Sequence, residues 1–305
     1  MKTKQTKRQL LQLQLKAGLI SESTYKMQLM LTEEDEQTFQ KKLQQIFKQN
    51  YAGFVAALGK FASDPKFRQF IKDTDVEKSQ VKMSSIPVTK LKPTQNEIDV
   101  DKSLAFPLTK AQAAAYALKG GSVKVASPII TFNGEYIVDG HHRWSQLYAI
   151  NKDASIVAYN FTNPQIKNPL DALKLTQVAI LGAGATKIPA ATVEGKNLLK
   201  MDEAAIKQYV VKTATDPVVE VFKKMRQLDS KDAVADYIWE NCASMQQTSQ
   251  PVSGAPGRGI MPQADAVPGG IQKTIATIQQ GVPQLSEVHK LIRKMIQEEL
   301  QKMKK

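Results

Sequence analysis

The residues of this chain that are best equipped for chemistry lie in one short run, from Asp139 to Trp144, with the sequence DGHHRW. Two of the three histidines in the chain, His141 and His142, are neighbours here. An arginine such as Arg143 can hold phosphate through two N–H donors, and an imidazole can donate to phosphate or transfer a proton. The carboxylate of Asp139 can hold Mg²⁺. The combination indicates phosphate or other anion chemistry.

The elements on either side of this run predict where it lies. The apolar, β-rich stretch 123–138 is interrupted at Asn133-Gly134, a pair that is typical of a hairpin turn, so it predicts two strands. The residues after the run have helical spacing, with apolar side chains at Trp144, Leu147, Tyr148 and Ile150. The polar run should therefore join the end of a strand to the start of a helix. The free N–H groups and positive dipole end of a helix N-terminus favour anions.

The neighbouring segments complete a compact α+β unit at residues 85–165. A strand is expected from Ile86, and a short helix at 109–118 should be closed by Gly120-Gly121. A further strand is expected at 154–161. A unit of about eighty residues is a plausible size for a small domain.

Three motifs in this unit resemble the ParB/sulfiredoxin superfamily. They are IPVTKLKPTQNE at 86–97, SPII at 127–130 and VDGHHRW at 138–144, and their order and spacing fit that family. The resemblance covers residues 85–162, about a quarter of the chain. It implies a nucleotide-binding fold in which a Gly-x-x-Arg turn holds the phosphates, here through Gly140, His141, His142 and Arg143.

The branches of this superfamily differ in their chemistry. Sulfiredoxins use a cysteine in the turn, where this chain has histidines, so sulfiredoxin activity is not expected. Chromosome-partitioning ParB proteins have an acid where this chain has His141, which argues against their type of CTP hydrolysis. The turn is most similar to that of the free-serine kinases. That similarity implies Glu97 as the base near an acceptor, Asp139 as the metal-binding or orienting acid, and His141 as a further catalytic residue. The implied cofactors are Mg²⁺ and a nucleotide, either ATP, ADP or CTP.

A structural interpretation of the same turn stays open. Asp139 could cap the helix, Arg143 could pair with an acid, and one imidazole could be buried. The glycine-containing stretch 181–186 lacks the GK[ST] ending of a phosphate loop, so it is weak evidence for a second phosphate site. The single cysteine, Cys242, is expected to be a small buried residue rather than a nucleophile.

The remaining chain is expected to consist of five further segments around the 85–165 domain. Residues 1–72 have a helical pattern and form an arm, and the polar residues 73–84 form a linker. A helical region follows at 166–245, then a Pro/Gly-rich linker at 246–270. An amphipathic helix at 271–305, with a stripe at Val288, Leu291, Ile292, Met295 and Ile296, ends the chain. The predicted fold class is thus a small ParB/sulfiredoxin-like α+β domain between helical N- and C-terminal regions.

Composition restricts the class of protein. The formal net charge is +13, and it is concentrated at the ends: residues 1–20 carry five basic residues and no acid. Basic ends suggest contact with nucleic acid, although the charge could also serve solubility alone. No apolar run approaches the length of a membrane span, and no signal peptide core follows the basic start. With one cysteine, an intracellular, cytoplasmic setting is expected, or one inside a phage particle.

Two main functions remain open on these grounds. The first is a protein that binds nucleotide or phosphate at the DGHHR turn, with phosphoryl transfer or nucleotide hydrolysis as its reaction. The alternative is a non-catalytic structural or DNA-associated component of a large assembly such as a bacteriophage virion, which oligomerises through the N-terminal helices and residues 271–305. A ParB-like nuclease is a third option, but it lacks a clear acidic metal cluster beyond Asp139, Glu135 and Glu97.

Overall fold

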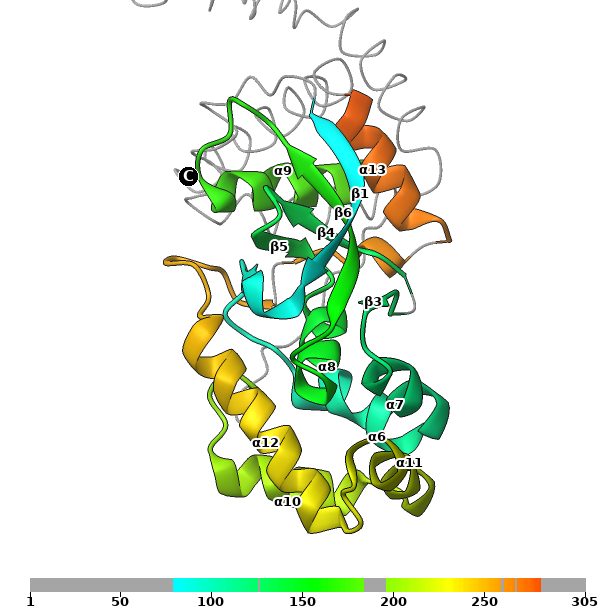
Figure 1. Ribbon diagram of the computed structural model, residues 1–305. Coiled ribbons are helices and arrows are strands. Elements are labelled where there is room, and N and C mark those ends of the chain that lie inside the picture. The colour runs from blue at the N-terminus through cyan, green and yellow to red at the C-terminus, as the bar shows by residue number, and fades with distance from the viewer. Residues whose placement is uncertain (1–78, 126, 184–195, 259–260, 267, 281–305) are drawn as a thin grey trace, which may run out of the picture. The chain divides into compact units, whose positions relative to one another are not determined.

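The computed structural model describes residues 79–125, 127–183, 196–258, 261–266 and 268–280. All of them belong to the second of two compact units, residues 52–305 (Figure 1). The predicted helical arm at 1–72 and the apolar stripe at 288–296 lie outside the described residues, as do residues 184–186 of the glycine-containing stretch at 181–186.

A mixed six-stranded sheet is the centre of this α+β fold. The strand order is β1-β6-β4-β5-β2, and β3 pairs with the first residues of β6. The pairs β1–β6 and β4–β5 are antiparallel, whereas β6 is parallel to β3 and β4, and β2 is parallel to β5. The strands are β1 (Gln80–Pro87), β2 (Lys92–Pro93), β3 (Ser122–Val123), β4 (Ile129–Phe132), β5 (Tyr136–Asp139) and β6 (Ser155–Thr162).

The predicted hairpin is confirmed and supplies the strand that ends at the site. All four residues of β4 are buried, and three of them are apolar. Asn133 and Gly134 both have positive φ, 54° and 67°, as a tight two-residue turn requires. The polar stretch 73–84, predicted to be a linker, instead contains the first half of β1. This edge strand pairs along its length with β6 alone and leaves many of its side chains exposed, so polar residues are tolerated there.

Helices lie both before and after the DGHHR run in the chain. They are α6 (Phe106–Thr109), α7 (Ala111–Leu118), α8 (His141–Ile150), α9 (Pro169–Gly182), α10 (Glu203–Thr213), α11 (Asp216–Arg226), α12 (Lys231–Thr248) and α13 (Gly270–Gln280). Three short turns complete them: the 3₁₀ segments Val88–Lys90 and Ala264–Ala266, and a π-helical turn, Asp101–Ala105. Within the described ranges, no helix is both long and apolar enough to cross a membrane.

Helix α8 is held rigidly by its buried aromatic face. Trp144 and Tyr148 are completely buried and meet edge to face, with ring centroids 5.7 Å apart. The indole N–H of Trp144 donates to the carbonyl of Val88 at 2.9 Å, so the polar atom of this large side chain is satisfied. The start of α8 is therefore a fixed point on which a site can be built.

One hydrophobic core joins the sheet to the helices α10–α12. Buried residues from Ile86 on β1 to Met245 on α12 form a single cluster. The amide of Asn241 on α12 donates to the carbonyl of Ala149 on α8 at 3.0 Å. Cys242 is fully buried in this core, as predicted, and burial raises the pKa of its thiol to about 12. The predicted helical region thus packs against the sheet unit.

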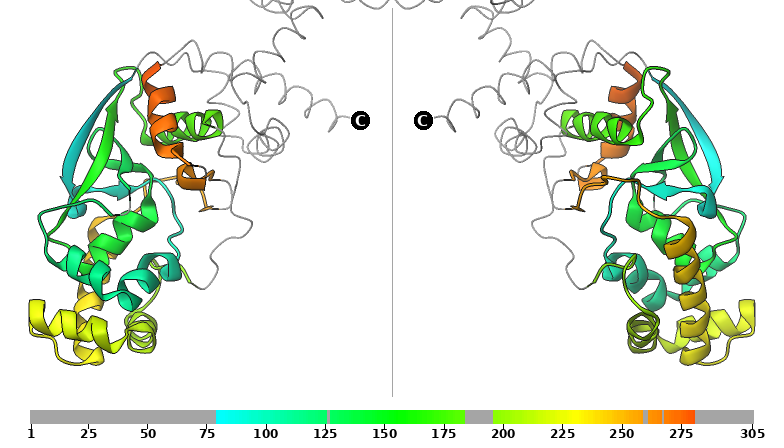
Figure 2. Two further views of the ribbon diagram at one scale, coloured as in Figure 1. Left: turned by 90° about the vertical axis from the view of Figure 1, so that its right-hand side faces the viewer. Right: turned by 90° about the vertical axis from the view of Figure 1, so that its left-hand side faces the viewer.

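The Pro/Gly-rich segment after α12 lies along the sheet unit. The N–H of Val252 donates to Pro93, and the N–H of Asn96 donates to Pro256, both at 3.1 Å. We call residues 249–258 and 261–266 the strap. Helix α13, which follows it, packs against α9 of the same chain, away from α10–α12 (Figures 1 and 2). The sequence predicted a linker here because prolines and glycines give no periodicity, but main-chain hydrogen bonds hold the segment in place.

Candidate functional site

The DGHHR run forms the predicted junction between a strand and a helix. β5 ends at Asp139, α8 begins at His141, and Gly140 between them has φ 92° and ψ 27°. A Cβ atom on Gly140 would lie 2.6 Å from Cγ2 of Ile129 and 2.9 Å from Nη2 of Arg143. Only glycine fits this left-handed, crowded position. Gly140 at the N-cap position has no side chain with which to cap α8, so the first N–H groups of the helix are left at its end without a partner from the cap residue.

Arg143 and Asp139 form a buried ion pair behind the turn. Nη2 of Arg143 lies 2.7 Å from Oδ2 of Asp139, and their side chains are only 12% and 10% exposed. Nη1 of Arg143 donates to Ser127 and, at 3.1 Å, to the carbonyl of Pro128. Both terminal nitrogens are thus committed to the protein. The pairing agrees with the structural interpretation of Arg143, although the cap position is occupied by Gly140 rather than Asp139.

The two histidines accept hydrogen bonds from the segment 94–99. The N–H of Thr94 donates to Nε2 of His141 at 3.2 Å, and the N–H of Asp99 donates to Nε2 of His142 at 3.1 Å. Each Nε2 is therefore unprotonated, which places the proton of the neutral ring on Nδ1. Both imidazoles attach the preceding loop to the start of α8.

Burial keeps both rings neutral. His141 is only 3% exposed, and burial lowers its pKa to about 3. The pKa of His142 is also lowered to about 3, first by burial and then by the positive charges of Arg258, Lys102 and Arg143. Near neutral pH neither ring is a protonated imidazolium, so neither can act as a cationic proton donor.

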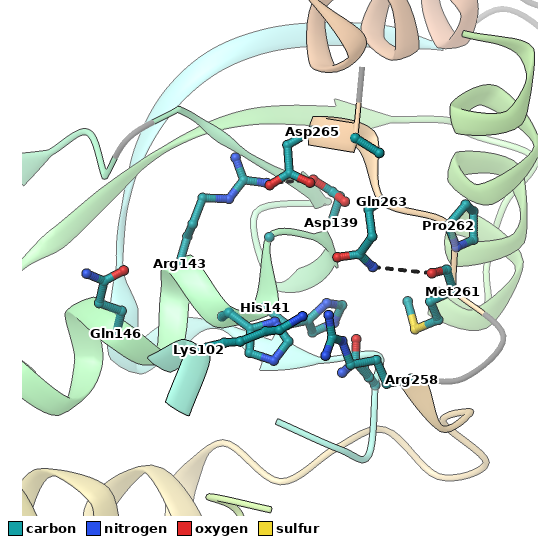
Figure 3. Close-up of a pocket in the computed structure, with 14 residues that line it drawn as sticks. Lys102, Asp139, His141, Arg143, Gln146, Arg258, Met261, Pro262, Gln263 and Asp265 are labelled. Carbon is teal, nitrogen blue, oxygen red and sulfur yellow. Dashed lines mark hydrogen bonds and ion pairs between the residues drawn. The ribbon is translucent and has the colours of Figure 1, made fainter. Parts of the chain in front are cut away.

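A pocket of about 430 Å³ opens in front of this turn (Figure 3). Asp139, Arg143 and Asp265 lie on one side of it in that view, and Lys102 and Arg258 on the other. Its walls come from the segment 95–102, the start of α8 and the strap. The lining residues are Gln95, Lys102, Asp139, Gly140, His141, His142, Arg143, Gln146, Arg258, Met261, Pro262, Gln263, Asp265 and Ala266.

Arg258 is the most unusual member of the pocket. It is 5% exposed, and its Nε is buried without a hydrogen-bond partner among the described residues. Burial lowers its pKa, while the carboxylates of Asp99, Asp265 and Glu97 act in the opposite direction. A buried guanidinium nitrogen without an acceptor is costly, so this group calls for an anion.

The strap residues of the site were missed by sequence reasoning. Arg258 and Asp265 both lie in the stretch 246–270, which was predicted to be a linker. A signal did exist, because Arg258 is the only basic residue and Asp265 the only acidic residue of that stretch. Lys102 was also missed. It reaches the pocket from the π-helical turn, a form that is frequent at functional sites.

Glu97, the base implied by the family resemblance, does not line the pocket. Its Oε2 accepts the main-chain N–H of Arg258 at 2.8 Å, so it faces the back of the strap. The other residues implied at the site, namely Asp139, Gly140, His141, His142 and Arg143, all line the pocket.

The two carboxylates of the pocket, Asp139 and Asp265, differ in how well they fit a metal ion. In the parts of the chain that the structure describes, no group of three or more His, Cys, Asp or Glu side chains is arranged to hold one. The carboxylate of Asp139 is engaged by Arg143 and by the main chain of Ala264. Burial, helped by the nearby charge of Asp265, raises the pKa of Asp139. Asp265 is exposed at the pocket, so it fits Mg²⁺ better than the predicted ligand Asp139 does.

Comparisons with known proteins identify no relative. The chain matches no protein-family model, no curated protein and no solved structure.

Proposed function

We propose that this protein binds a phosphorylated ligand, a nucleotide together with Mg²⁺, in the pocket at the N-terminus of α8. The observation that carries the proposal is Arg258, which is buried in the pocket with its Nε unpartnered. A phosphate group in the pocket would give this under-partnered guanidinium a charge-assisted hydrogen bond. The uncapped start of α8 adds outward N–H groups and the positive end of the helix dipole on the same pocket.

The size and lining of the pocket support a nucleotide rather than a bare phosphate ion. A pocket of about 430 Å³ lies within the range of small-molecule sites, which is roughly 300–1,000 Å³. Met261, Pro262 and Ala266 provide apolar surface beside the polar groups, on which the non-phosphate part of a ligand can pack. Asp265 would hold the Mg²⁺ from one side, while the phosphates ligate it from the other.

A ParB/sulfiredoxin-like fold is part of this proposal. The three motifs of the resemblance fall on consecutive parts of the site: 86–97 leads from the end of β1 past β2, 127–130 enters β4, and 138–144 joins β5 to α8. That arrangement supports a phosphate-binding turn at Gly140. In this proposal, Arg143 holds the turn through its ion pair with Asp139, and Arg258 contacts the ligand.

Replacing Arg258 by methionine should weaken binding of the ligand at least tenfold. A hydrogen bond to a charged group contributes roughly 1.5–3 kcal/mol, which is about a tenfold to hundredfold change in affinity. Methionine keeps an unbranched chain in the buried space and removes only the guanidinium. Calorimetric titration with ATP, ADP and CTP, each with Mg²⁺, measures the loss, and the same samples can be assayed for phosphate release.

The matched control is Lys224→Gln, which removes one positive charge from the exposed surface of α11 and should leave the affinity unchanged. Raised salt suppresses nonspecific attraction of nucleotides to the basic ends. If the wild-type protein releases no heat with any of the three nucleotides, or if both variants lose affinity equally, the proposed binding site is wrong.

Asp265→Asn should reduce the Mg²⁺-dependent part of the affinity. The asparagine keeps an oxygen at the same place but has no negative charge, so it is a weaker ligand for a hard cation. We expect nucleotide affinity measured with Mg²⁺ to fall severalfold, and affinity measured with excess chelator to stay the same or rise. Asp229→Asn, on an exposed residue before α12, is the control. An equal loss with and without Mg²⁺ would remove Asp265 from the metal site.

The alternative of an assembly component depends on segments outside the described residues. The N-terminal helices and residues 271–305 were predicted to provide its subunit contacts, and of these only residues 271–280 are described. The first part of the expected C-terminal helix, α13, packs against α9 within the same chain.

A further inference from the structure

Glu97 has an unusually close relation to the strap. Its carboxylate accepts the N–H of Arg258 at 2.8 Å, across 161 positions of sequence. A Cβ atom on Gly257 would lie 3.2 Å from Oε2 of Glu97, so the main chain of the strap passes directly over the carboxylate. A side chain at 257 would crowd this contact, and glycine allows it.

The residue before Glu97 strengthens the same attachment. The main-chain N–H of Asn96 donates to the carbonyl of Pro256 at 3.1 Å, and its side-chain amide donates to the carbonyl of Ala255 at 2.9 Å. Together with the bond to Glu97, these bonds hold the main chain at Ala255, Pro256 and Arg258. The main chain that carries the Arg258 side chain is therefore anchored immediately beside that residue.

The other side of this anchor is the start of α8. His141 accepts the N–H of Thr94 and His142 accepts the N–H of Asp99, so both ends of the loop 94–99 are tied to the helix. Glu97 lies in the middle of that loop. The histidines thus fix the loop to the helix N-terminus, and Glu97, which belongs to that loop, binds the main chain of Arg258.

We infer that Glu97 is a positioning residue, which holds Arg258 over the N-terminus of α8 and so couples docking of the strap to ligand binding. This inference rests on the proposed function and goes beyond it. Glu97 acts through the main chain of residue 258 and does not touch the ligand, in contrast to the catalytic base that the family resemblance implies. Because coupling is reciprocal, a ligand bound to Arg258 stabilises the docked strap by the same factor by which docking improves affinity.

The test is a double-mutant cycle on Glu97 and Arg258, with nucleotide affinity as the readout. Glu97→Ala should weaken binding of the Mg²⁺-nucleotide at least tenfold. In the Arg258→Met background, Glu97→Ala should weaken binding by less than about threefold further. The side chain through which Glu97 acts is already absent there. Glu97→Gln keeps an oxygen acceptor for the Arg258 N–H and should retain affinity within about threefold. If Glu97 were instead a catalytic base, Glu97→Gln would also bind normally but would abolish turnover, whereas a positioning residue leaves the turnover of this variant nearly unchanged.

A second readout follows the strap itself. In the full-length protein without ligand, Glu97→Ala should speed amide hydrogen exchange in a peptide covering residues 252–258, and Glu97→Gln should do so much less. Glu135→Ala is the matched control, because Glu135 forms an exposed ion pair with Lys92 and does not line the pocket. It should change neither exchange in the strap nor affinity.

The outcomes separate this inference from the proposed function. If the wild type binds nucleotide but Glu97→Ala binds equally well, or if the two substitutions are additive, the positioning role is refuted and the binding site stands. Unchanged hydrogen exchange in Glu97→Ala likewise refutes the anchor alone. If the wild type binds no nucleotide, both proposals fail.

Discussion

Acidification from pH 8 to pH 5 is expected to lower the free energy of unfolding by about 4 kcal/mol, because two neutral histidines take up protons when the chain unfolds. The pKa of His141 and that of His142 are lowered from 6.5 to about 3 in the folded protein. Their contribution to stability is therefore complete above pH 6.5 and is lost as the pH falls from 6.5 toward 3. Each histidine adds a slope of up to about 1.4 kcal/mol per pH unit in that window.

Asp139 acts in the opposite direction. Its pKa is raised in the folded protein, so its protonation favours the folded state as the pH falls and that benefit is lost as the pH rises through its folded pKa. It offsets part of the histidine effect at the acidic end of the range. Urea unfolding at pH 8, 7, 6 and 5 measures the sum.

Glutamine variants assign the effect to the two rings. His141→Gln and His142→Gln each place an amide oxygen near the position of Nε2, so the N–H groups of Thr94 and Asp99 can keep an acceptor that does not titrate. Each single variant should lose about half of the pH dependence, and the double variant nearly all of it. His289→Asn provides a background without the third histidine. If the double variant keeps the full slope, the titrating groups lie elsewhere.

Replacing Gly140 by alanine is expected to destabilise the protein by about 3 kcal/mol and to abolish nucleotide binding. Roughly 1–2 kcal/mol comes from a left-handed residue that gains a Cβ, and about 1–3 kcal/mol from forcing that atom into a well-packed neighbour. The neighbour is Ile129, whose Cγ2 would lie at 2.6 Å. Relief of the clash moves β4 away from α8, which distorts the pocket wall. Thermal or urea unfolding and calorimetric titration measure the two losses.

Gly121→Ala is the matched control for this substitution. Gly121 also has positive φ, 70°, but a Cβ there meets no atom within 4 Å. It should therefore show the backbone penalty alone, roughly 1–2 kcal/mol, with normal affinity for the ligand. Equal destabilisation by the two alanines would mean that the contact with Ile129 relaxes freely, and the argument for a sterically required glycine would fail.

These predictions concern a turn in which structural and functional interpretations coexist. The ion pair of Asp139 with Arg143 and the two acceptor imidazoles give the turn its shape, whereas the uncapped helix end and Arg258 face the pocket. Residues that were predicted from the sequence to take part in chemistry therefore stabilise the shape of the turn. In the proposed function, the ligand is instead held by Arg258, which comes from another part of the chain.

The local features of this site could be predicted from the sequence because they depend on neighbours in the chain. The apolar, β-rich run and the turn at Asn133-Gly134 define the hairpin, and the apolar spacing after His142 defines α8. A strand, a glycine and a helix in immediate succession place the DGHHR run at a helix N-terminus whatever the remaining chain does. The burial of Cys242 could likewise be predicted, because a free cysteine is among the residue types most often buried.

Only the tertiary structure decided which residues complete the pocket and what each one does. Arg258 meets Glu97 across 161 positions, in a segment of prolines and glycines whose position depends on individual main-chain hydrogen bonds and leaves no periodic trace in the sequence. The neutral state of the histidines depends on burial, which is a property of the packed fold. The sequence by itself determined that the DGHHR run lies between a strand and a helix, and only the folded chain brought Arg258 of the strap to the same pocket.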